Sequence, residues 1–233
     1  MENLVKKKSK VGDHTFFDKS LFPWVAGLEA NWEDISKELE VVMGNTDAIP
    51  SFQDVSAEQK ELTVDDKWKT FFFYFYGHKR EENCRRCPRT IELLKTIPGM
   101  KTAFFSILSP NKHIPAHRGP YNGVLRLHIG LRIPQNRMNC KIRVGNDFGY
   151  WEQGKALIFD DSYEHEVWND TDETRVVLFV DFLRPLPQPA DRLNQFYIKH
   201  IAASRFIQDA VGNLDKIMGG SKAKKSKLQQ TPA

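Results

Sequence analysis

The sequence predicts a mainly β domain with flanking helices, built as an antiparallel sandwich or barrel. After Lys101, short runs rich in strand-forming residues follow one another, and each is bounded by Gly, Pro, Asn or Asp. Little helical periodicity separates these runs, whereas apolar residues recur at spacings of three and four on both sides of the region. The expected strands are residues 102–108, 124–133, 140–144, 156–159 and 175–182.

The region before this β core is expected to be helical, with one buried strand. Apolar residues in 24–43 recur at helical spacing and predict an amphipathic helix. Residues 47–66 are polar and interrupted by a proline, which indicates a loop. The aromatic run 68–76 predicts a buried strand, and Pro88 favours the first turn of a short helix that a Pro-Gly pair ends.

A chain of 233 residues is long enough for one well-packed domain. We expect a disordered basic N-terminal tail (1–22) and a single domain (23–218) that is helical to about residue 100. The β core of this domain spans about 101–186, and C-terminal helices follow over 189–218, where apolar residues return to helical spacing. A second disordered basic tail is expected over 219–233.

Charge and composition exclude several classes of function. The net charge is +4, from 34 basic and 30 acidic residues that are well mixed, so a nucleic-acid-binding face is not expected. The basic clusters lie at the two ends, where weak attraction to an anionic membrane surface is a second interpretation. No apolar run is long enough to span a bilayer, and lysines follow Val5 at once, so neither a membrane anchor nor a signal peptide is expected.

Cysteine usage favours a reducing compartment, and we expect a cytoplasmic protein. Three cysteines, an odd number, give no disulfide framework. Cys84 and Cys87 form a single C-x-x-C motif, which is typical of a redox pair or of half a zinc site. Because no second pair exists, ordinary thiols before a helix are the simpler interpretation.

Two histidines and an arginine are the main candidates for chemistry. His117 and His165 lie 48 residues apart, each beside an expected strand, and Arg175 follows ten residues after the second. Imidazoles could hold a non-haem iron, and a cation could bind a 2-oxo acid. The carboxylate expected two residues after the first histidine is replaced by Gly119. A lone histidine in such a place is more often a surface residue, so spacing alone leaves both interpretations open.

Two expected strands sharpen these alternatives. Arg126 and His128 share one face of a strand, although a solvated polar face would explain both. Arg175 opens a nearly continuous apolar strand, where an unpaired guanidinium is costly to bury. A dicarboxylate ligand would supply its partner, and Asp172 or Glu173 is the ordinary competitor.

Three ordered motifs carry a resemblance to a known family. They are residues 115–120 (PAHRGP), 125–131 (LRLHIGL) and 151–168 (WEQGKALIFDDSYEHEVW). Over roughly 68–185 the chain resembles the aspartyl/asparaginyl β-hydroxylases. This resemblance implies a double-stranded β-helix (a cupin-like jelly roll) that is an Fe(II)- and 2-oxoglutarate-dependent dioxygenase, using O2 to hydroxylate an unactivated C–H bond.

The resemblance also implies roles for individual residues. His117 and His165 match the metal ligands, and the aspartyl β-hydroxylases similarly have a glycine at the position of Gly119. Ser106 and Arg175 match the positions that hold the distal carboxylate of 2-oxoglutarate.

The same motifs imply three further roles. Arg126 and His128 match positions near the carboxylate beside iron. Asp161 lies four residues before His165, where it could hydrogen-bond a water on the metal.

Three hypotheses for the function are considered, and the first is favoured. It is hydroxylation at the β-carbon of an aspartyl or asparaginyl residue or a related small acid, with Arg118 and Lys155 as possible cations at the mouth. The second is hydroxylation of a lipid acyl chain, since the chain also resembles the lipid A acyl-chain hydroxylases. Those enzymes usually have aspartate at the position of Gly119 and membrane-anchoring segments, and the absence of both features here weakens this alternative. The third is a cupin-like protein that binds a metal or carboxylate without turnover. Possible pocket aromatics are Trp68, Tyr121 and Trp168.

Overall fold

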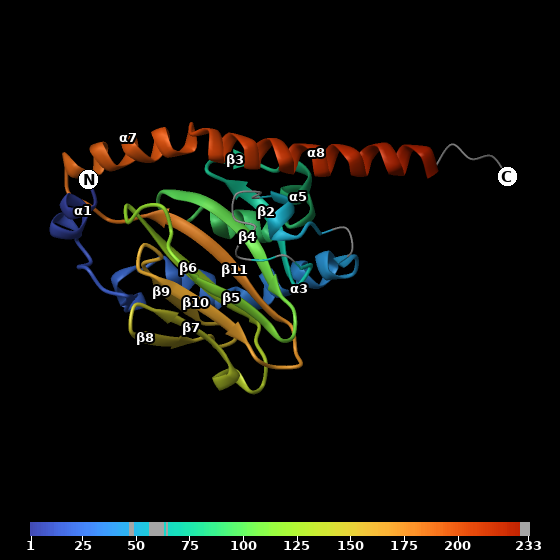
Figure 1. Cartoon of the computed structure of the whole chain (residues 1–233), viewed down its shortest axis with the longest axis horizontal. Coiled ribbons are helices and arrows are strands. Elements are labelled where there is room, and N and C mark those ends of the chain that lie inside the picture. Colours follow the sequence, from blue (N-terminus) through green and yellow to red (C-terminus); the bar gives the residue numbers. More distant parts are fainter. Residues whose placement is uncertain (47–48, 56–62, 64, 229–233) are drawn as a thin grey trace.

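The computed structural model describes residues 1–46, 49–55, 63 and 65–228. Two antiparallel sheets form its centre (Figure 1). The larger has seven strands in the order β1-β9-β6-β11-β4-β2-β3, and the smaller has four in the order β5-β10-β7-β8. The strands are β1 (Phe16–Phe17), β2 (Trp68–Phe75), β3 (His78–Lys79), β4 (Met100–Leu108), β5 (Lys112–His117), β6 (Val124–Arg132), β7 (Cys140–Val144), β8 (Asp147–Tyr150), β9 (Ala156–Phe159), β10 (His165–Asn169) and β11 (Arg175–Leu183).

The eight strands from β4 to β11 give the fold its identity. Strands β4, β11, β6 and β9 are neighbours in the larger sheet, while β5, β10, β7 and β8 make up the smaller one. Most successive connections therefore cross from one sheet to the other, which is the arrangement of a double-stranded β-helix. The predicted fold class, a mainly β jelly roll with flanking helices, is confirmed.

Helices cover the outer face of the larger sheet and one end of the molecule (Figure 1). They are α1 (Glu2–Lys8), α2 (Val25–Ala30), α3 (Trp32–Met43), α4 (Phe52–Val55), α5 (Glu81–Arg86), α6 (Pro88–Leu94), α7 (Ala190–Ala202) and α8 (Arg205–Leu228), with 3-10 turns at Lys19–Leu21 and Arg137–Asn139. None of the helices in the described part of the chain combines the length and the apolarity needed to cross a membrane.

The main hydrophobic core lies between the larger sheet and the N-terminal helices. Strand β11 is buried at eight of its nine positions, and Leu178 and Val180 face this core together with Ile35 and Leu39 of α3. A second apolar cluster lies between the two sheets and includes Trp151. The larger sheet is therefore packed on both faces.

Several expected elements need correction. The N-terminal 22 residues are not a disordered tail: α1 buries Val5, and β1 pairs with β9. The helix expected over 24–43 is two helices, because the backbone at Asn31 leaves helical geometry and its side chain donates to the carbonyl of Gly27. The expected loop over 47–66 contains the short helix α4, and residues 47–48, 56–62 and 64 lie outside the described residues.

The strand expected at 68–76 and the helix expected after Pro88 are present as β2 and α6. At the C-terminus, α8 continues to Leu228, ten residues beyond the expected end of the domain, and 229–233 lie outside the described residues. Lysines with good helix propensity continue the helical pattern there, which the composition of a basic tail concealed.

Candidate active site

His117 and His165 meet because β5 and β10 pair antiparallel, with a register shift just beyond the histidine pair. The two residues are direct partners in the ladder, and their ring centroids lie 4.1 Å apart. Nδ1 of each ring faces a carbonyl two residues back, that of Pro115 at 2.8 Å and that of Tyr163 at 3.0 Å. A ring that donates from Nδ1 keeps the lone pair on Nε2, which is the form that binds a metal.

Burial keeps both imidazoles neutral. It lowers the pKa of His117, and it lowers the pKa of His165 to about 3, with smaller contributions from His117 and Arg126. A neutral ring needs no proton removed before it coordinates a cation. No cluster of three or more His, Cys, Asp or Glu side chains suited to a metal occurs among the described residues, so the pair stands without a third protein ligand of these types there.

Asp161 fills the space beside Gly119. The Gly119 amide donates to the backbone carbonyl of Asp161 at 2.7 Å, and a Cβ atom on Gly119 would collide with the Asp161 carboxylate. A carboxylate-bearing side chain therefore cannot stand at position 119 while Asp161 keeps its place.

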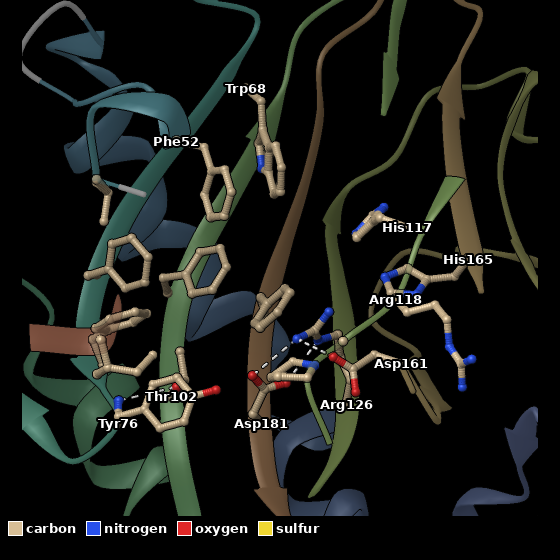
Figure 2. Close-up of a pocket in the computed structure, with 18 residues that line it drawn as sticks. Phe52, Trp68, Tyr76, Thr102, His117, Arg118, Arg126, Asp161, His165 and Asp181 are labelled. Carbon is tan, nitrogen blue, oxygen red and sulfur yellow. Dashed lines mark hydrogen bonds and ion pairs between the residues drawn. The ribbon is translucent and has the colours of Figure 1, made fainter. Parts of the chain in front are cut away.

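Arg126 is held between two carboxylates (Figure 2). Its guanidinium lies 2.8 Å from Oδ2 of Asp161 and 2.8 Å from Oδ1 of Asp181, its cross-strand partner on β11. Burial raises the pKa of Asp161, and Arg126 opposes that rise. The guanidinium thus fixes Asp161 at the edge of the histidine pair rather than standing free for a ligand.

Arg175 is different, because it is buried without an acidic partner. Only 2% of it is exposed, and its Nη1 lies 3.5 Å from Oγ of Ser106, which also accepts from Trp68 Nε1 at 3.1 Å. No carboxylate in the described part of the chain pairs with it, and its Nε has no hydrogen-bond partner there. Burial lowers its pKa to about 10.

The ordinary partners considered for Arg175 are engaged elsewhere or exposed. Glu173 accepts from the amide of Gln135, and Asp172 is exposed. Instead, the guanidinium carbon lies 4.7 Å from the ring centroid of Trp151. A cation held over an aromatic face with free N–H groups is ready for a carboxylate.

His128 offers a second unpaired donor. Trp151 Nε1 donates to its Nδ1 at 3.1 Å, which requires the proton of the neutral ring to lie on Nε2. That Nε2 atom is buried and has no partner among the described residues, and burial holds the pKa of the ring well below its ordinary value. An N–H group without an acceptor at this depth calls for an anionic or carbonyl oxygen.

Two adjoining pockets collect these side chains. We call inner pocket the one lined by the predicted residues Ser106, His117, Arg126, His128, His165 and Arg175. The outer pocket, about 190 Å³, shares His117, Arg126 and His165 with it and adds Asp161. All seven predicted site residues therefore line one continuous region.

These side chains fit the iron and 2-oxoglutarate that the family resemblance implies. Two neutral imidazoles suit a divalent metal, while the unpaired N–H groups of Arg175 and His128 suit a carboxylate-bearing ligand deeper in the barrel. The two unsatisfied donors are the observation that tests the fit, because each is costly in an empty apolar cavity.

The outer pocket is walled mainly by aromatic rings (Figure 2). Phe52 of α4 stacks on Trp68 with ring centroids 3.9 Å apart, and Phe104 stacks on Phe179 at 4.1 Å. The other apolar lining residues are Val55, Phe72, Phe75, Pro120 and Ile207. Polar groups, among them Tyr76, Thr102 and Asp181, gather at one end.

Other sequence predictions had mixed outcomes. Trp68 lines both pockets, but Tyr121 packs on Tyr197 and Trp168 stacks on His113, so neither of these two lines them. Arg118 lines the outer pocket.

Lys155 lies in a separate hollow, beside Lys19 and Tyr150. Cys84 and Cys87 are buried free thiols.

Sequence reasoning missed two residues. Asp181 closes the ion pair with Arg126, and Trp151 positions both His128 and Arg175. An acidic residue inside an apolar strand was the available signal for Asp181. Trp151 opens the longest of the quoted motifs, but nothing in a sequence says where an indole points.

Comparisons with known proteins identify the family of this chain. The family model for aspartyl/asparaginyl β-hydroxylase matches residues 29–185. An ornithine lipid ester-linked acyl 2-hydroxylase from Rhizobium tropici is 48% identical over 212 residues, covering 91% of this chain and 75% of the relative. The human aspartyl/asparaginyl β-hydroxylase is 37% identical over 173 residues, or 72% of this chain, which spans only 22% of that enzyme.

A solved oxidoreductase of the 2OG-Fe(II) oxygenase family from Burkholderia pseudomallei aligns with 51% of this chain and 67% of its own, at 12% identity and a TM-score of 0.40. The relatives reported above are hydroxylases by name. With its family model spanning the jelly roll and both histidines, the chain belongs to the aspartyl/asparaginyl β-hydroxylase family.

Proposed function

We propose that this protein is an Fe(II)- and 2-oxoglutarate-dependent dioxygenase that hydroxylates an acyl chain of a lipid. The buried, unpaired guanidinium of Arg175 carries the cosubstrate assignment, because it lies in one pocket with the neutral imidazoles of His117 and His165. The aromatic outer pocket supports the assignment of the substrate class.

Each side chain has a defined task in this proposal. His117 and His165 hold the metal through Nε2, while Arg175 and Ser106 bind the distal carboxylate of 2-oxoglutarate. His128 donates from Nε2 to an oxygen of the same ligand. Bound iron and 2-oxoglutarate would supply the oxidant, with O2 as the source of oxygen and succinate and carbon dioxide as products.

Asp161 acts as a positioning residue. Its carboxylate is fixed by Arg126 and lies where a third protein ligand would otherwise stand. From there its carboxylate would accept a hydrogen bond from a water molecule beside the histidine pair. The aromatic walls orient the reacting carbon and exclude water from it.

An acyl chain matches the outer pocket better than an acid. Burying methylene groups against aromatic rings contributes about 0.8 kcal/mol for each one, whereas a substrate carboxylate needs a free cation. Arg126, a cation of that wall, is already paired with two carboxylates. The acyl 2-hydroxylase from R. tropici points to the same class of substrate.

An aspartyl or asparaginyl residue is the second candidate. Arg118 lines the outer pocket, and although its Nε donates to the carbonyl of Ser162, it forms no ion pair among the described residues. The guanidinium of Arg118 would bind the carboxylate of such a substrate. The human relative is named for hydroxylation of aspartyl and asparaginyl residues.

Turnover by the purified protein tests these proposals. We expect succinate to form from 2-oxoglutarate only with Fe(II), O2 and a lipid extract, and one acyl chain to gain the mass of one oxygen atom. If an aspartyl peptide stimulated succinate formation and the lipid extract did not, the acyl-chain assignment would be overturned. Metal and 2-oxoglutarate binding without turnover on either substrate would indicate a binding protein instead.

Two histidine variants provide the matched comparison. His117→Ala should abolish succinate formation, because it removes half of the protein ligand set. His113→Ala changes the same strand four residues earlier, where the ring is exposed and stacked on Trp168, and should retain activity. Equal activity in the two variants would contradict the metal assignment.

A further inference from the structure

Helix α7 carries three large, partly exposed apolar side chains on one face. Leu193, Phe196 and Tyr197 lie three and four residues apart, on one face of the helix. They are 46%, 62% and 43% exposed. The other large exposed apolar residues are scattered, one to an element: Leu21, Val41, Met138 and Phe148, with Met1 beside α1. We call Leu193, Phe196 and Tyr197 the docking face.

The docking face is linked to the wall of the outer pocket through one contact. The ring of Tyr197 packs on Tyr121 with centroids 4.6 Å apart, and Tyr121 directly follows Pro120, which lines the outer pocket. Ile207 of α8, the helix that follows α7, also lines that pocket.

Helix α7 is fixed firmly to the domain. Its opposite side buries Ala190 and Ile198 against Val5 of α1. Asn194 donates from its side chain to the carbonyl of Gly123 at 2.8 Å. Apolar exposure on a rigid, well-packed helix is a property of the surface and not a sign of a loose end.

Positive charge gathers on α1 and α7. Together these two helices contain five basic and two acidic residues, although the net charge of the whole chain is only +4. Figure 1 shows α1 and α7 side by side at one end of the molecule, with α8 continuing along the top. Apolar side chains flanked by lysines are the pattern of a surface that lies in the interface of an anionic bilayer.

We propose that the docking face and the surrounding basic helices bind the surface of an anionic phospholipid membrane. Phe196 and Leu193 insert among the lipid head groups, and the lysines of α1 bind the surface charge. The outer pocket then opens toward the lipid, so an acyl chain reaches the histidine pair without crossing water. A second copy of the chain fits this face less well, because two such faces would bring like charges together.

Vesicle binding tests the inference on the full-length protein. Phosphatidylcholine vesicles with and without phosphatidylglycerol are used, free of iron, 2-oxoglutarate and any substrate lipid. We expect binding that requires phosphatidylglycerol and weakens with salt. Leu193→Ser/Phe196→Ser should lower the partition coefficient about tenfold, since about two exposed apolar side chains no longer insert.

Matched controls distinguish binding through the docking face from nonspecific binding of any exposed apolar residue. Phe148→Ser removes a ring of similar exposure, 51%, that also has a lysine nearby but lies on β8, and it should bind vesicles like the wild type. Lys7→Glu/Lys8→Glu should weaken binding without changing the far-ultraviolet circular dichroism. Equal losses in the Phe148 and Phe196 variants, or no binding to phosphatidylglycerol vesicles, would overturn the proposal.

Two other results would also count against it. A concentration-dependent dimer that Phe196→Ser dissolves would assign the face to a second copy of the chain. Unchanged binding at high salt would remove the role of the basic helices. Because these measurements need no turnover, they succeed or fail separately from the proposed reaction, on which only the delivery of an acyl chain depends.

Discussion

Gly119 and Asp161 compete for one volume beside the histidine pair. The amide of Gly119 donates to the backbone carbonyl of Asp161, and any Cβ at position 119 would meet the Asp161 carboxylate. That carboxylate cannot move cheaply, because it is 1% exposed and paired with Arg126. The missing third ligand and the buried acid are thus two aspects of the same packing.

Gly119→Ala should therefore destabilise the protein by about 1–3 kcal/mol, the usual cost of overpacking. Thermal unfolding measures it. Adding Asp161→Ala should recover part of the loss, since the clash is relieved. Gly27→Ala is the matched control: apart from its chain neighbours and the backbone of its own helix, no atom among the described residues lies within 4 Å of the added methyl group. A single Gly119→Ala variant as stable as the wild type would contradict the competition.

Arg175→Met should leave the unliganded protein as stable as before, or more so. The native guanidinium is buried without an acidic partner in the described part of the chain, and its removal leaves no charge uncompensated. The affinity for 2-oxoglutarate should fall about 100-fold, as expected for loss of a buried charge pair. Calorimetry measures both quantities, and a large fall in melting temperature would indicate a structural role instead.

Arg184→Met should have the opposite effect on stability. Arg184 and Asp160 are both fully buried and form an ion pair. Removing the guanidinium leaves the buried Asp160 carboxylate without an ion-pair partner, which costs about 3–5 kcal/mol. Chemical denaturation of the two arginine variants side by side distinguishes a paired arginine from one awaiting a ligand. Similar stabilities of the two variants would show that ion pairing does not decide how much a buried arginine contributes.

Phe52→Ala should weaken binding of a lipid substrate and leave the cosubstrate unaffected. Phe52 stacks on Trp68 in the wall of the outer pocket, but it does not line the inner pocket. We expect KM for the lipid to rise about tenfold, as for loss of one buried aromatic contact, with unchanged 2-oxoglutarate affinity. An equal rise in KM from Phe148→Ala, on β8, would argue against lipid binding in the outer pocket.

The three cysteine thiols should be inert in the native protein. Burial raises the pKa of Cys84, that of Cys87 to about 12 and that of Cys140 to about 11. A pH of 8 lies below the pKa of each thiol, so the reactive thiolate is scarce. A disulfide-exchange reagent should label them only on unfolding. Fast labelling of two thiols in the folded state would revive a redox role for the C-x-x-C motif.

The sequence predicted five of the eight strands from β4 to β11, because turn residues bound each of them. It missed β5, β8 and β10, and two of these carry His117 and His165. It could not predict the partner of Arg126, since the pairing with Asp181 depends on how β6 and β11 align across the sheet. The N-terminal segment was misjudged because its short apolar stretches become meaningful only against β9 and α7.

The seven site residues could be predicted from the sequence for different reasons. Spacing and flanking turns drew attention to His117, His165 and Arg175, whereas the resemblance to the family was needed for Ser106 and for the roles of the others. Their common location in adjoining pockets is a property of the fold. The roles themselves stay predictions until metal and cosubstrate binding are measured.

The direct pairing of His165 with His117 has a kinetic consequence. Adjacent ladder positions hold their Cα atoms about 4.5–5.5 Å apart, so the backbone and not a flexible loop sets the spacing between the two rings. Because the two strands hold the rings in place, the site should change little in conformation when a metal ion leaves. Loss and reloading of the metal should therefore be a reversible exchange on a standing scaffold, and a metal-depleted preparation should regain activity without refolding.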